Sequence, residues 1–194
     1  MKKHFPLTLL ILFIPYWTYL AFDPYERGIW WAENLPVMAT VLVLILTFRK
    51  FRFSNLSYFF MAWWIFGHTY GGHYSFSLAP FDLVNDFFGW ERNMFDRFGH
   101  FMIGLFALPV AELMWRNKWI TKPVPTILFA LFSIVTLAAF YELIEWQFAV
   151  IFGGESASDF LGSQGDVWDA QKDILMDTLG AIFSLLFFKQ ITKE

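Results

Sequence analysis

The stretch from Gly165 to Gly180, GDVWDAQKDILMDTLG, decides how this chain is organised, because it carries four aspartates at helical spacing and leads directly into an apolar segment. The four are Asp166, Asp169, Asp173 and Asp177, at positions i, i+3, i+7 and i+11. On a helix this spacing places all four on one face. The helix continues into the apolar run from Ala181 to Phe188, so the last two aspartates should lie at membrane depth. An uncompensated carboxylate there is costly and usually functional.

The composition is that of a polytopic membrane protein. Of 194 residues, 57% are hydrophobic, 22% aromatic and 16% charged, and the mean hydropathy is +0.47. The absence of cysteine excludes disulfides, thiolate metal ligands and a thiol nucleophile. We expect one all-α transmembrane domain over residues 1–194, a membrane lipid as partner and no nucleic acid.

Six apolar runs are long enough to cross a hydrocarbon core of ~30 Å, which takes about 17 to 25 helical residues. They fall at about 5–22, 32–48, 56–72, 98–115, 124–151 and 171–189. The first follows a basic start like that of a secretory signal, but no small-residue cleavage site comes after it. We therefore expect it to be retained, which predicts a bundle of six transmembrane helices.

The basic residues alternate by side in this six-span arrangement. Ten of the fourteen lie on one side: Lys2, Lys3, Arg49, Lys50, Arg52, Arg116, Lys118, Lys122, Lys189 and Lys193. The positive-inside rule places that side, with both termini, in the cytoplasm. The acidic loops at about 73–97 and 152–170 then face outward, and their many aromatic residues predict ordered caps.

This topology brings polar segments to the outer ends of four spans. The third span ends with GHTYGGHY at 67–74, and the fourth begins with DRFGHF at 96–101. The fifth reaches the outside through YELIEW at 141–146, and the sixth leaves it through the aspartate face. All four segments face the same leaflet, which predicts one polar pocket in the outer half of the bundle.

Several of these residues also have a purely structural interpretation. Asp96 and His100, at i and i+4, could form only a local hydrogen bond near a helix start. His68 and His73 are separated by two glycines, a spacing too irregular for a helical metal pair, and each could be an interface histidine.

The two acids of the fifth span are harder to explain structurally. Glu142 and Glu145 interrupt an apolar run, where they need a partner, a shared proton or a cation. Glu112 lies near the inner end of the fourth span beside Arg116, and we expect a local ion pair there, away from the pocket.

Two chemistries fit the predicted pocket. Histidines and carboxylates together suit Zn²⁺, Mn²⁺ or Fe²⁺, and carboxylates alone suit Ca²⁺ or Mg²⁺, although no H-E-x-x-H, E-x-x-H or EF-hand pattern is present. The candidate metal ligands are His68, His73, His100, Glu145 and Asp173.

In the second chemistry, Arg97 binds the phosphate of a lipid head group, with an acid as general base and a histidine as general acid. The candidate catalytic residues are His100, Glu142, Glu145, Asp173 and Asp177. The candidate ligand-binding residues are Tyr70, Asp96, Arg97, Asp166 and Asp169. No G-x-S-x-G motif supports a serine nucleophile.

Four longer segments resemble a known family. They are YGGHYSFSLAPFD at 70–82, DRFGHF at 96–101, FYELIEW at 140–146 and LGSQGDVWDAQKDILMDTLGA at 161–181. Together they look like the bacterial inner-membrane YjdF-like family of unknown function, over about residues 25–188. The resemblance implies a small envelope protein and supplies no established reaction.

A more distant similarity is to VanZ-like membrane proteins. Its motifs are D-x-x-x-H-F at 96–101, E-x-x-E at 142–145 and D-x-x-x-D-x-x-G at 173–180. In that family the second acid of the middle motif is often glutamine, and the position of Asp177 is often asparagine. This chain is more acidic than that pattern, which argues against a simple transfer of any VanZ role.

These features together predict a multi-pass protein of the bacterial inner membrane with its pocket on the periplasmic side. We expect it to bind or process an envelope lipid or a lipid-linked head group, with a divalent metal as a candidate cofactor. One alternative is a small proton- or cation-coupled transporter, for which the inner halves of the spans offer few polar residues. Another is a structural envelope protein with a buried ion-pair network. Within the aspartate face, we expect Asp173 and Asp177 to be buried, and Asp166 and Asp169 to cap the helix start.

Overall fold

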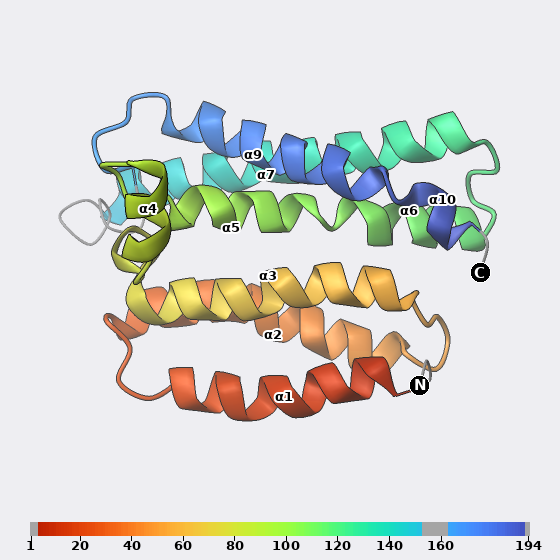
Figure 1. Cartoon of the computed structure of the whole chain (residues 1–194), viewed down its shortest axis with the longest axis horizontal. Helices are drawn as coiled ribbons and strands as arrows, with labels where there is room; N and C mark the ends of the chain where they lie inside the picture. The colour runs from red at the N-terminus through yellow and green to blue at the C-terminus, as the bar shows by residue number, and fades with distance from the viewer. Residues whose placement is uncertain (1–3, 153–162, 193–194) are drawn as a thin grey trace.

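The computed structural model describes residues 4–152 and 163–192, and its regular structure is helical, with no strand in those two ranges. Long helical elements lie side by side along the long axis of the molecule (Figure 1). They are α1 (Phe5–Leu20), α2 (Arg27–Thr47), α3 (Asn55–Tyr74), α5 (Phe95–Gly104) continued by α6 (Ala107–Arg116), α7 (Pro123–Phe152), and α9 (Asp169–Leu185) continued by the short α10 (Phe188–Ile191). The expectation of an all-α protein is confirmed.

Three helical stretches of the described chain are long and apolar enough to cross a membrane. They are Arg27–Thr47, Phe95–Arg116 and Pro123–Ile151, and the apolar α1 is shorter, at 16 residues. The apolar runs expected at 56–72 and 171–189 coincide with α3 and α9, which carry more polar residues. Helices therefore lie at all six expected runs, while the number that crosses the membrane stays a prediction.

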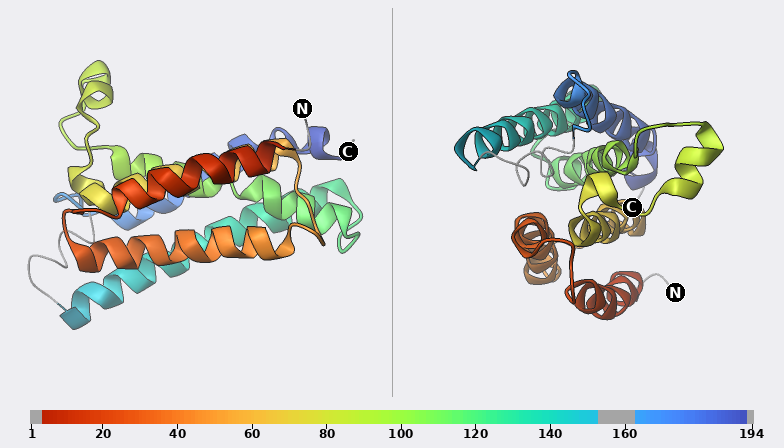
Figure 2. Two further views of the ribbon diagram at one scale, coloured as in Figure 1. Left: turned by 90° about the horizontal axis from the view of Figure 1, so that it is seen from below. Right: turned by 90° about the vertical axis from the view of Figure 1, so that its left-hand side faces the viewer.

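The helices form two groups that meet where α3 packs against α5. One group contains α1, α2 and α3, and the other contains α5, α6, α7 and α9 (Figures 1 and 2). Each group has its own apolar core. Val37, Met61 and Trp64 are buried in the first core, and Leu108 and Ile134 are buried in the second.

The fourth apolar run is one rod with a break between α5 and α6. The break falls at Leu105 and Phe106, four and three residues before Pro109. Proline has no N–H to donate to the carbonyl four residues earlier, and its ring crowds that carbonyl. Pro109 therefore accounts for the interruption, which separates the polar α5 from the more apolar start of α6.

Helices α5 and α9 cross in direct backbone contact at two glycines, Gly104 and Gly180. A Cβ atom built on Gly104 would collide with the backbone of Asp177 and lie 2.7 Å from the backbone nitrogen of Ala181. A Cβ atom on Gly180 would collide with the backbone carbonyl of Phe101. The two backbones therefore touch, which small residues alone permit. We call this contact the glycine seam. It fixes the distance between the facing sides of α5 and α9 in the turns next to it.

We call the end of the bundle that carries the connections after α1, α3 and α7 the cap end, and the end where α1 begins and α10 finishes the terminal end (Figure 1). The 73–97 connection at the cap end contains the 3₁₀ helix η1 (Phe76–Leu78) and α4 (Asp82–Phe88). In the end-on view of Figure 2, α4 projects sideways from the long helices. The second expected cap, at 152–170, lies mostly outside the described residues.

Candidate functional site

Arg97, in the first turn of α5, binds three of the four aspartates of the α9 face. Its Nη2 donates to Oδ1 of Asp169 at 2.6 Å and to Oδ2 of Asp166 at 3.1 Å. Its Nη1 donates to Asp173 and, at 2.9 Å, to the backbone carbonyl of Asp169. Both terminal nitrogens of this buried guanidinium are thus engaged with α9 and its preceding turn. Arg97 aligns the aspartates, and it does not present a free guanidinium to a phosphate.

Two further cations balance the outer aspartates. Arg92 lies 2.7 Å from Oδ1 of Asp169 and 3.6 Å from Oδ2 of Asp96, measured from its Nη1 and Nη2 respectively. Lys172 donates from Nζ to Oδ2 of Asp166 at 2.6 Å. Hydrogen bonds from Lys172 and from the backbone N–H of Trp168 lower the pKa of Asp166 to about 2. The outer part of the site is therefore a closed ion-pair network.

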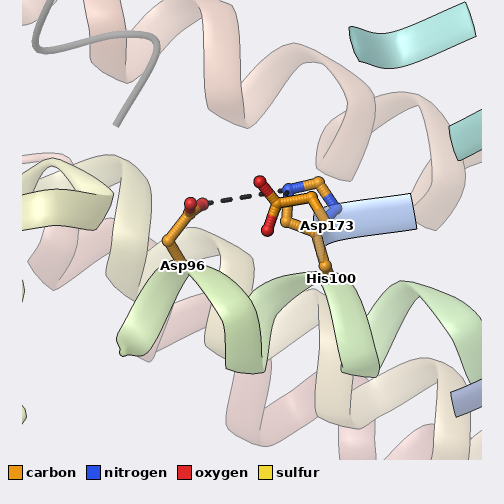
Figure 3. Close-up of side chains that lie close together, drawn as sticks. All are labelled: Asp96, His100 and Asp173. Atoms are coloured by element: carbon orange, nitrogen blue, oxygen red, sulfur yellow. Dashed lines mark ion pairs between the residues drawn. The ribbon is translucent and has the colours of Figure 1, made fainter. Parts of the chain in front are cut away.

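His100, one turn deeper on α5, is the centre of the inner part of the site. Its Nδ1 lies 2.9 Å from Oδ2 of Asp177 on α9. Its Nε2 faces Oδ1 of Asp96 at 3.9 Å, Oε1 of Glu142 at 3.8 Å and Oδ1 of Asp173 at 3.8 Å. Figure 3 shows Asp96 and His100 from α5 and Asp173 from α9 pointing toward one another. Three helices, α5, α7 and α9, therefore supply the groups around this imidazole.

Two buried carboxylate oxygens of the inner part make no hydrogen bond with the described residues. They are Oε1 of Glu142 and Oδ1 of Asp177, on side chains that are 10% and 1% exposed. Nearly all buried polar atoms in proteins have a partner, so each exception needs an explanation. The inner part, unlike the outer part, has acceptor capacity to spare.

A second carboxylate and imidazole pair lies across a small cavity from His100. His68 on α3 approaches Glu33 on α2, with Nε2 and Oε2 separated by 2.9 Å. The cavity has a volume of about 20 Å³, and its lining includes Glu33, His68, Asp96, His100, Tyr141 and Glu145. A cavity of this size holds one water molecule or one ion. A head group would have to approach from the cap end and could not occupy the cavity itself.

The sequence-predicted residues divide into those at this centre and those away from it. The structure brings together Asp96, Arg97, His100, Glu142, Asp166, Asp169, Asp173 and Asp177, with His68 and Glu145 facing the cavity. His73 is elsewhere, with Nδ1 2.9 Å from the backbone oxygen of Leu20. The hydroxyl of Tyr70 donates to the backbone oxygen of Pro80 at 3.2 Å. His73 therefore joins α3 to the end of α1, and Tyr70 joins α3 to the 73–97 connection.

The sequence analysis missed Arg92 and Glu33. Arg92 lies four residues before Asp96, the spacing of a helical ion pair, so the sequence did hold a signal for it. Glu33 lies at the start of the apolar run expected at about 32–48, and the spacing there gives no sign of a buried acid. Helix α2 begins at Arg27, so Glu33 is well inside the helix and buried.

Glu112 lies at the other end of the bundle and forms the expected local ion pair. Its Oε1 accepts from Nη1 of Arg116 at 2.6 Å. Between Glu112 and the His100 centre lie the glycine seam and the apolar core around Leu105, Leu108 and Ile134. The prediction of an ion pair away from the pocket is confirmed.

The fold and the centre together define a class: an all-helical membrane protein with ionisable side chains buried between its helices. Within that class, the chain belongs to the family described as "Predicted membrane protein (DUF2238)", whose model matches residues 5–194. The chain is also 33% identical over 187 residues to the inner membrane protein YjdF of Escherichia coli (strain K12). That alignment covers 93% of this chain and 85% of the relative.

The resemblance to the YjdF-like family is therefore confirmed, while the similarity to VanZ-like proteins stays a prediction. No solved structure matches the chain.

Proposed function

We propose that this protein crosses the inner membrane six times, with both termini in the cytoplasm, and that it binds or processes a lipid head group at the periplasmic leaflet. Supporting this orientation, seven of the eleven basic residues in the described ranges lie toward the terminal end of the bundle. They are Arg49, Lys50, Arg52, Arg116, Lys118, Lys122 and Lys189. The acidic connections lie at the cap end, and under the positive-inside rule this distribution supports a periplasmic cap end.

The observation that carries the functional proposal is a gradient of exposure along the aspartate face. Side-chain exposure falls from 19% at Asp166 to 13% at Asp169, 3% at Asp173 and 1% at Asp177. The polar centre thus begins at the surface of the cap end and extends inward. Below Asp177 it meets the glycine seam and the apolar core. A centre reached from one side suits binding or chemistry at one leaflet.

The same arrangement disfavours the transporter alternative. A transport path has to continue to the other side of the membrane, and its polar residues should continue with it. Here Leu105, Leu108 and Ile134 fill the region beyond Asp177. Glu112, the next buried acid toward the terminal end, already has its hydrogen bonds satisfied by neighbouring residues.

The charge of the centre indicates which head group fits. Six carboxylates, those of Asp96, Glu142, Asp166, Asp169, Asp173 and Asp177, lie with three permanent cations, Arg92, Arg97 and Lys172. Counted formally as ionised, the six carboxylates exceed the three permanent cations by three, and Arg97 is engaged. A bare phosphate would be repelled, whereas a head group with an ammonium group would be attracted. We therefore propose an amine-bearing lipid as the ligand.

His100 supplies acid–base capacity for processing such a head group. The bond to Asp177 fixes the ring, as a carboxylate fixes a catalytic histidine in other enzymes, and Nε2 faces the remaining acids. A water molecule or hydroxyl group beside Nε2 of His100 would contact the imidazole as a base and the nearby carboxylates as hydrogen-bond acceptors. The geometry supports proton transfer at this atom.

Binding of lipids to the purified protein tests the proposal. The protein is delipidated in detergent, titrated with phosphatidylethanolamine or phosphatidylglycerol, and examined by native mass spectrometry. We expect preferential retention of phosphatidylethanolamine, reduced at least about tenfold in affinity by Asp173→Asn. Asp86→Asn, which changes an exposed acid on α4 at the same end, is the matched control and should bind like wild type.

Equal retention of the two lipids by the wild-type protein would reject a head-group site of this charge. A loss of folded protein in Asp173→Asn but not in Asp86→Asn, with no change in the lipid preference of the folded fraction, would instead support a purely structural role for the ion pairs.

A further inference from the structure

The imidazole Nε2 of His100 has an unusual set of neighbours. Three carboxylate oxygens lie 3.8 to 3.9 Å from it, from Asp96, Glu142 and Asp173. Hydrogen bonds between nitrogen and oxygen have lengths of about 2.7 to 3.2 Å, so none of the three oxygens is bonded to Nε2. The three oxygens lie at nearly equal distances from the nitrogen.

These separations are close to those between ligand atoms around a metal ion. A tetrahedral ion with bonds of about 2.0 to 2.2 Å holds its ligand atoms about 3.3 to 3.6 Å apart. One ligand atom each from Asp96, His100 and Asp173 already fall within 4.8 Å of one another. A side-chain adjustment that brings these three atoms closer together, and Oε1 of Glu142 with them, would complete the set.

Asp177 provides the orientation that a metal-binding histidine requires. It accepts from Nδ1 of His100 at 2.9 Å, which leaves Nε2 to present its lone pair to the three carboxylates. Carboxylate, imidazole and metal in this order recur in protein metal sites, because the carboxylate fixes the ring and raises the basicity of the ligand. Asp177 is therefore a positioning residue.

Glu142 gives an independent indication of a ligand. Its Oε1 has no hydrogen bond to the described residues, its side chain is nine-tenths buried, and it points toward Nε2 of His100. In the described residues, Asp96 pairs with Arg92 and Asp173 pairs with Arg97, while Arg92 also lies 2.7 Å from Asp169. A divalent cation together with Arg97 would neutralise all three carboxylates.

We propose that Asp96, His100, Glu142 and Asp173 bind one divalent first-row transition-metal ion, with Asp177 holding the imidazole in place. One imidazole and three carboxylates form a mixed nitrogen and oxygen set that suits Mn²⁺, Fe²⁺ or Zn²⁺ better than Ca²⁺ or Mg²⁺. The set shares only His100 and Asp173 with the ligands that the sequence analysis named.

Such an ion would extend the chemistry of the centre. A bound metal polarises a coordinated oxygen and lowers the pKa of a bound water toward neutrality. It would also let the centre accept a phosphate oxygen that its carboxylates otherwise repel. This use of the ion rests on the proposed head-group function, whereas binding of the ion does not.

Titration of the full-length protein with manganese tests the site. The protein is purified in detergent, stripped with a chelator and titrated with MnCl₂, while free Mn²⁺ is followed by its paramagnetic resonance signal. We expect one bound Mn²⁺ per chain, displaced by Zn²⁺, with coupling to a single nitrogen in pulsed spectra. Glu142→Gln and Asp96→Asn should each weaken binding at least about tenfold, and Asp86→Asn should not change it.

Three results would overturn the inference: no stoichiometric Mn²⁺ in the wild type, no nitrogen coupling, or equal binding by Glu142→Gln, Asp96→Asn and wild type. Nitrogen coupling is measured on the wild type, so it decides the question even if a variant fails to fold. Lipid retention measured on the same chelator-treated samples separates the two proposals. A preference for phosphatidylethanolamine without manganese binding rejects the metal site alone.

Discussion

Glu112 and Glu142 are both glutamates on helices of the same bundle, and their surroundings differ in one decisive way. Glu112, at the terminal end, has both carboxylate oxygens bonded. Glu142, near the cap end, has Oε1 without a hydrogen bond to the described residues. A buried acid in a membrane helix is therefore not in itself a sign of a site. A site is indicated by a buried carboxylate oxygen that accepts no hydrogen bond from the described residues around it.

The carboxylate of Glu112 has all its hydrogen bonds to neighbouring residues and connects two helices. Its Oε1 accepts from the backbone N–H of Ser54 at 2.7 Å and from Arg116 at 2.6 Å, and its Oε2 accepts from the hydroxyls of Ser54 at 2.9 Å and Ser57 at 2.5 Å. Ser54 is also the N-cap of α3, accepting from the backbone N–H of Ser57 at 3.2 Å. One carboxylate thus fastens α6 to the start of α3, and no capacity remains for a ligand.

The strongest test of the difference between Glu112 and Glu142 is to make the same substitution at both positions. Glu112→Gln should lower the free energy of unfolding by about 3 kcal/mol, because the new amide hydrogens face the donors of Ser54, Ser57 and Arg116. Glu142→Gln should change it by less than about 0.5 kcal/mol or raise it, because the acceptor without a partner is replaced. Thermal unfolding in detergent, followed by circular dichroism, measures both. Equal losses at the two positions would remove the distinction.

The glycine seam between the two regions should show the next largest effect. Gly180→Ala places a methyl group against the backbone of Phe101 and should cost about 1 to 3 kcal/mol, as overpacking does elsewhere. Because α5 and α9 are pushed apart, metal or lipid binding at His100 should fall in the folded fraction. Leu179→Ala, at the exposed neighbouring position, is the control. A Gly180→Ala protein as stable as this control would show that the helices do not touch there.

Asp177→Asn should act on ligand binding with little effect on the fold. The amide can still occupy the place of the carboxylate, but it is a weaker acceptor for Nδ1 of His100. Loss of such a partner typically costs about 10- to 100-fold in metal affinity. Mn²⁺ titration and unfolding of the same preparation measure the two effects separately. Unchanged Mn²⁺ affinity in a folded Asp177→Asn protein would exclude the positioning role.

The smallest effect should come from the exposed aspartate of the outer network. Asp166 has its pKa lowered from 3.8 to about 2, so its contribution to stability is present above about pH 4 and is lost as the pH falls through 2. The difference in unfolding temperature between wild type and Asp166→Asn should follow this course and shrink in high salt. A difference that is constant from pH 2 to pH 6 would contradict it.

Much of the fold could be predicted because the hydrocarbon thickness sets the length of an apolar helix. Helices lie at each expected run, and the convergence of Asp96, His100, Asp173 and Asp177 follows from the direction of two helices and the spacing along each. These features depend on length and periodicity, which a sequence displays directly.

The features that could not be predicted depend on how each helix is rotated and where it begins. His73 follows His68 by five residues on α3, yet His68 turns to Glu33 and His73 turns to the end of α1. Nothing in the spacing decides which histidine faces the cavity. The assignment of Arg97 to a phosphate assumed a free guanidinium, and only the relative placement of α5 and α9 shows that the aspartates occupy it.

The aspartate face also has a consequence for how the protein is made. Helix α9 has 17 residues and includes Asp169, Asp173 and Asp177, so it would enter a bilayer poorly as an isolated segment. Its partners Arg97 and His100 lie more than 70 residues earlier in the chain, and α5 leaves the ribosome well before α9. Until α9 is synthesised, Arg97 and His100 therefore lack their aspartate partners on that helix. In the proposed six-span topology, insertion of α9 into the membrane and assembly of the centre are therefore a single event in biogenesis.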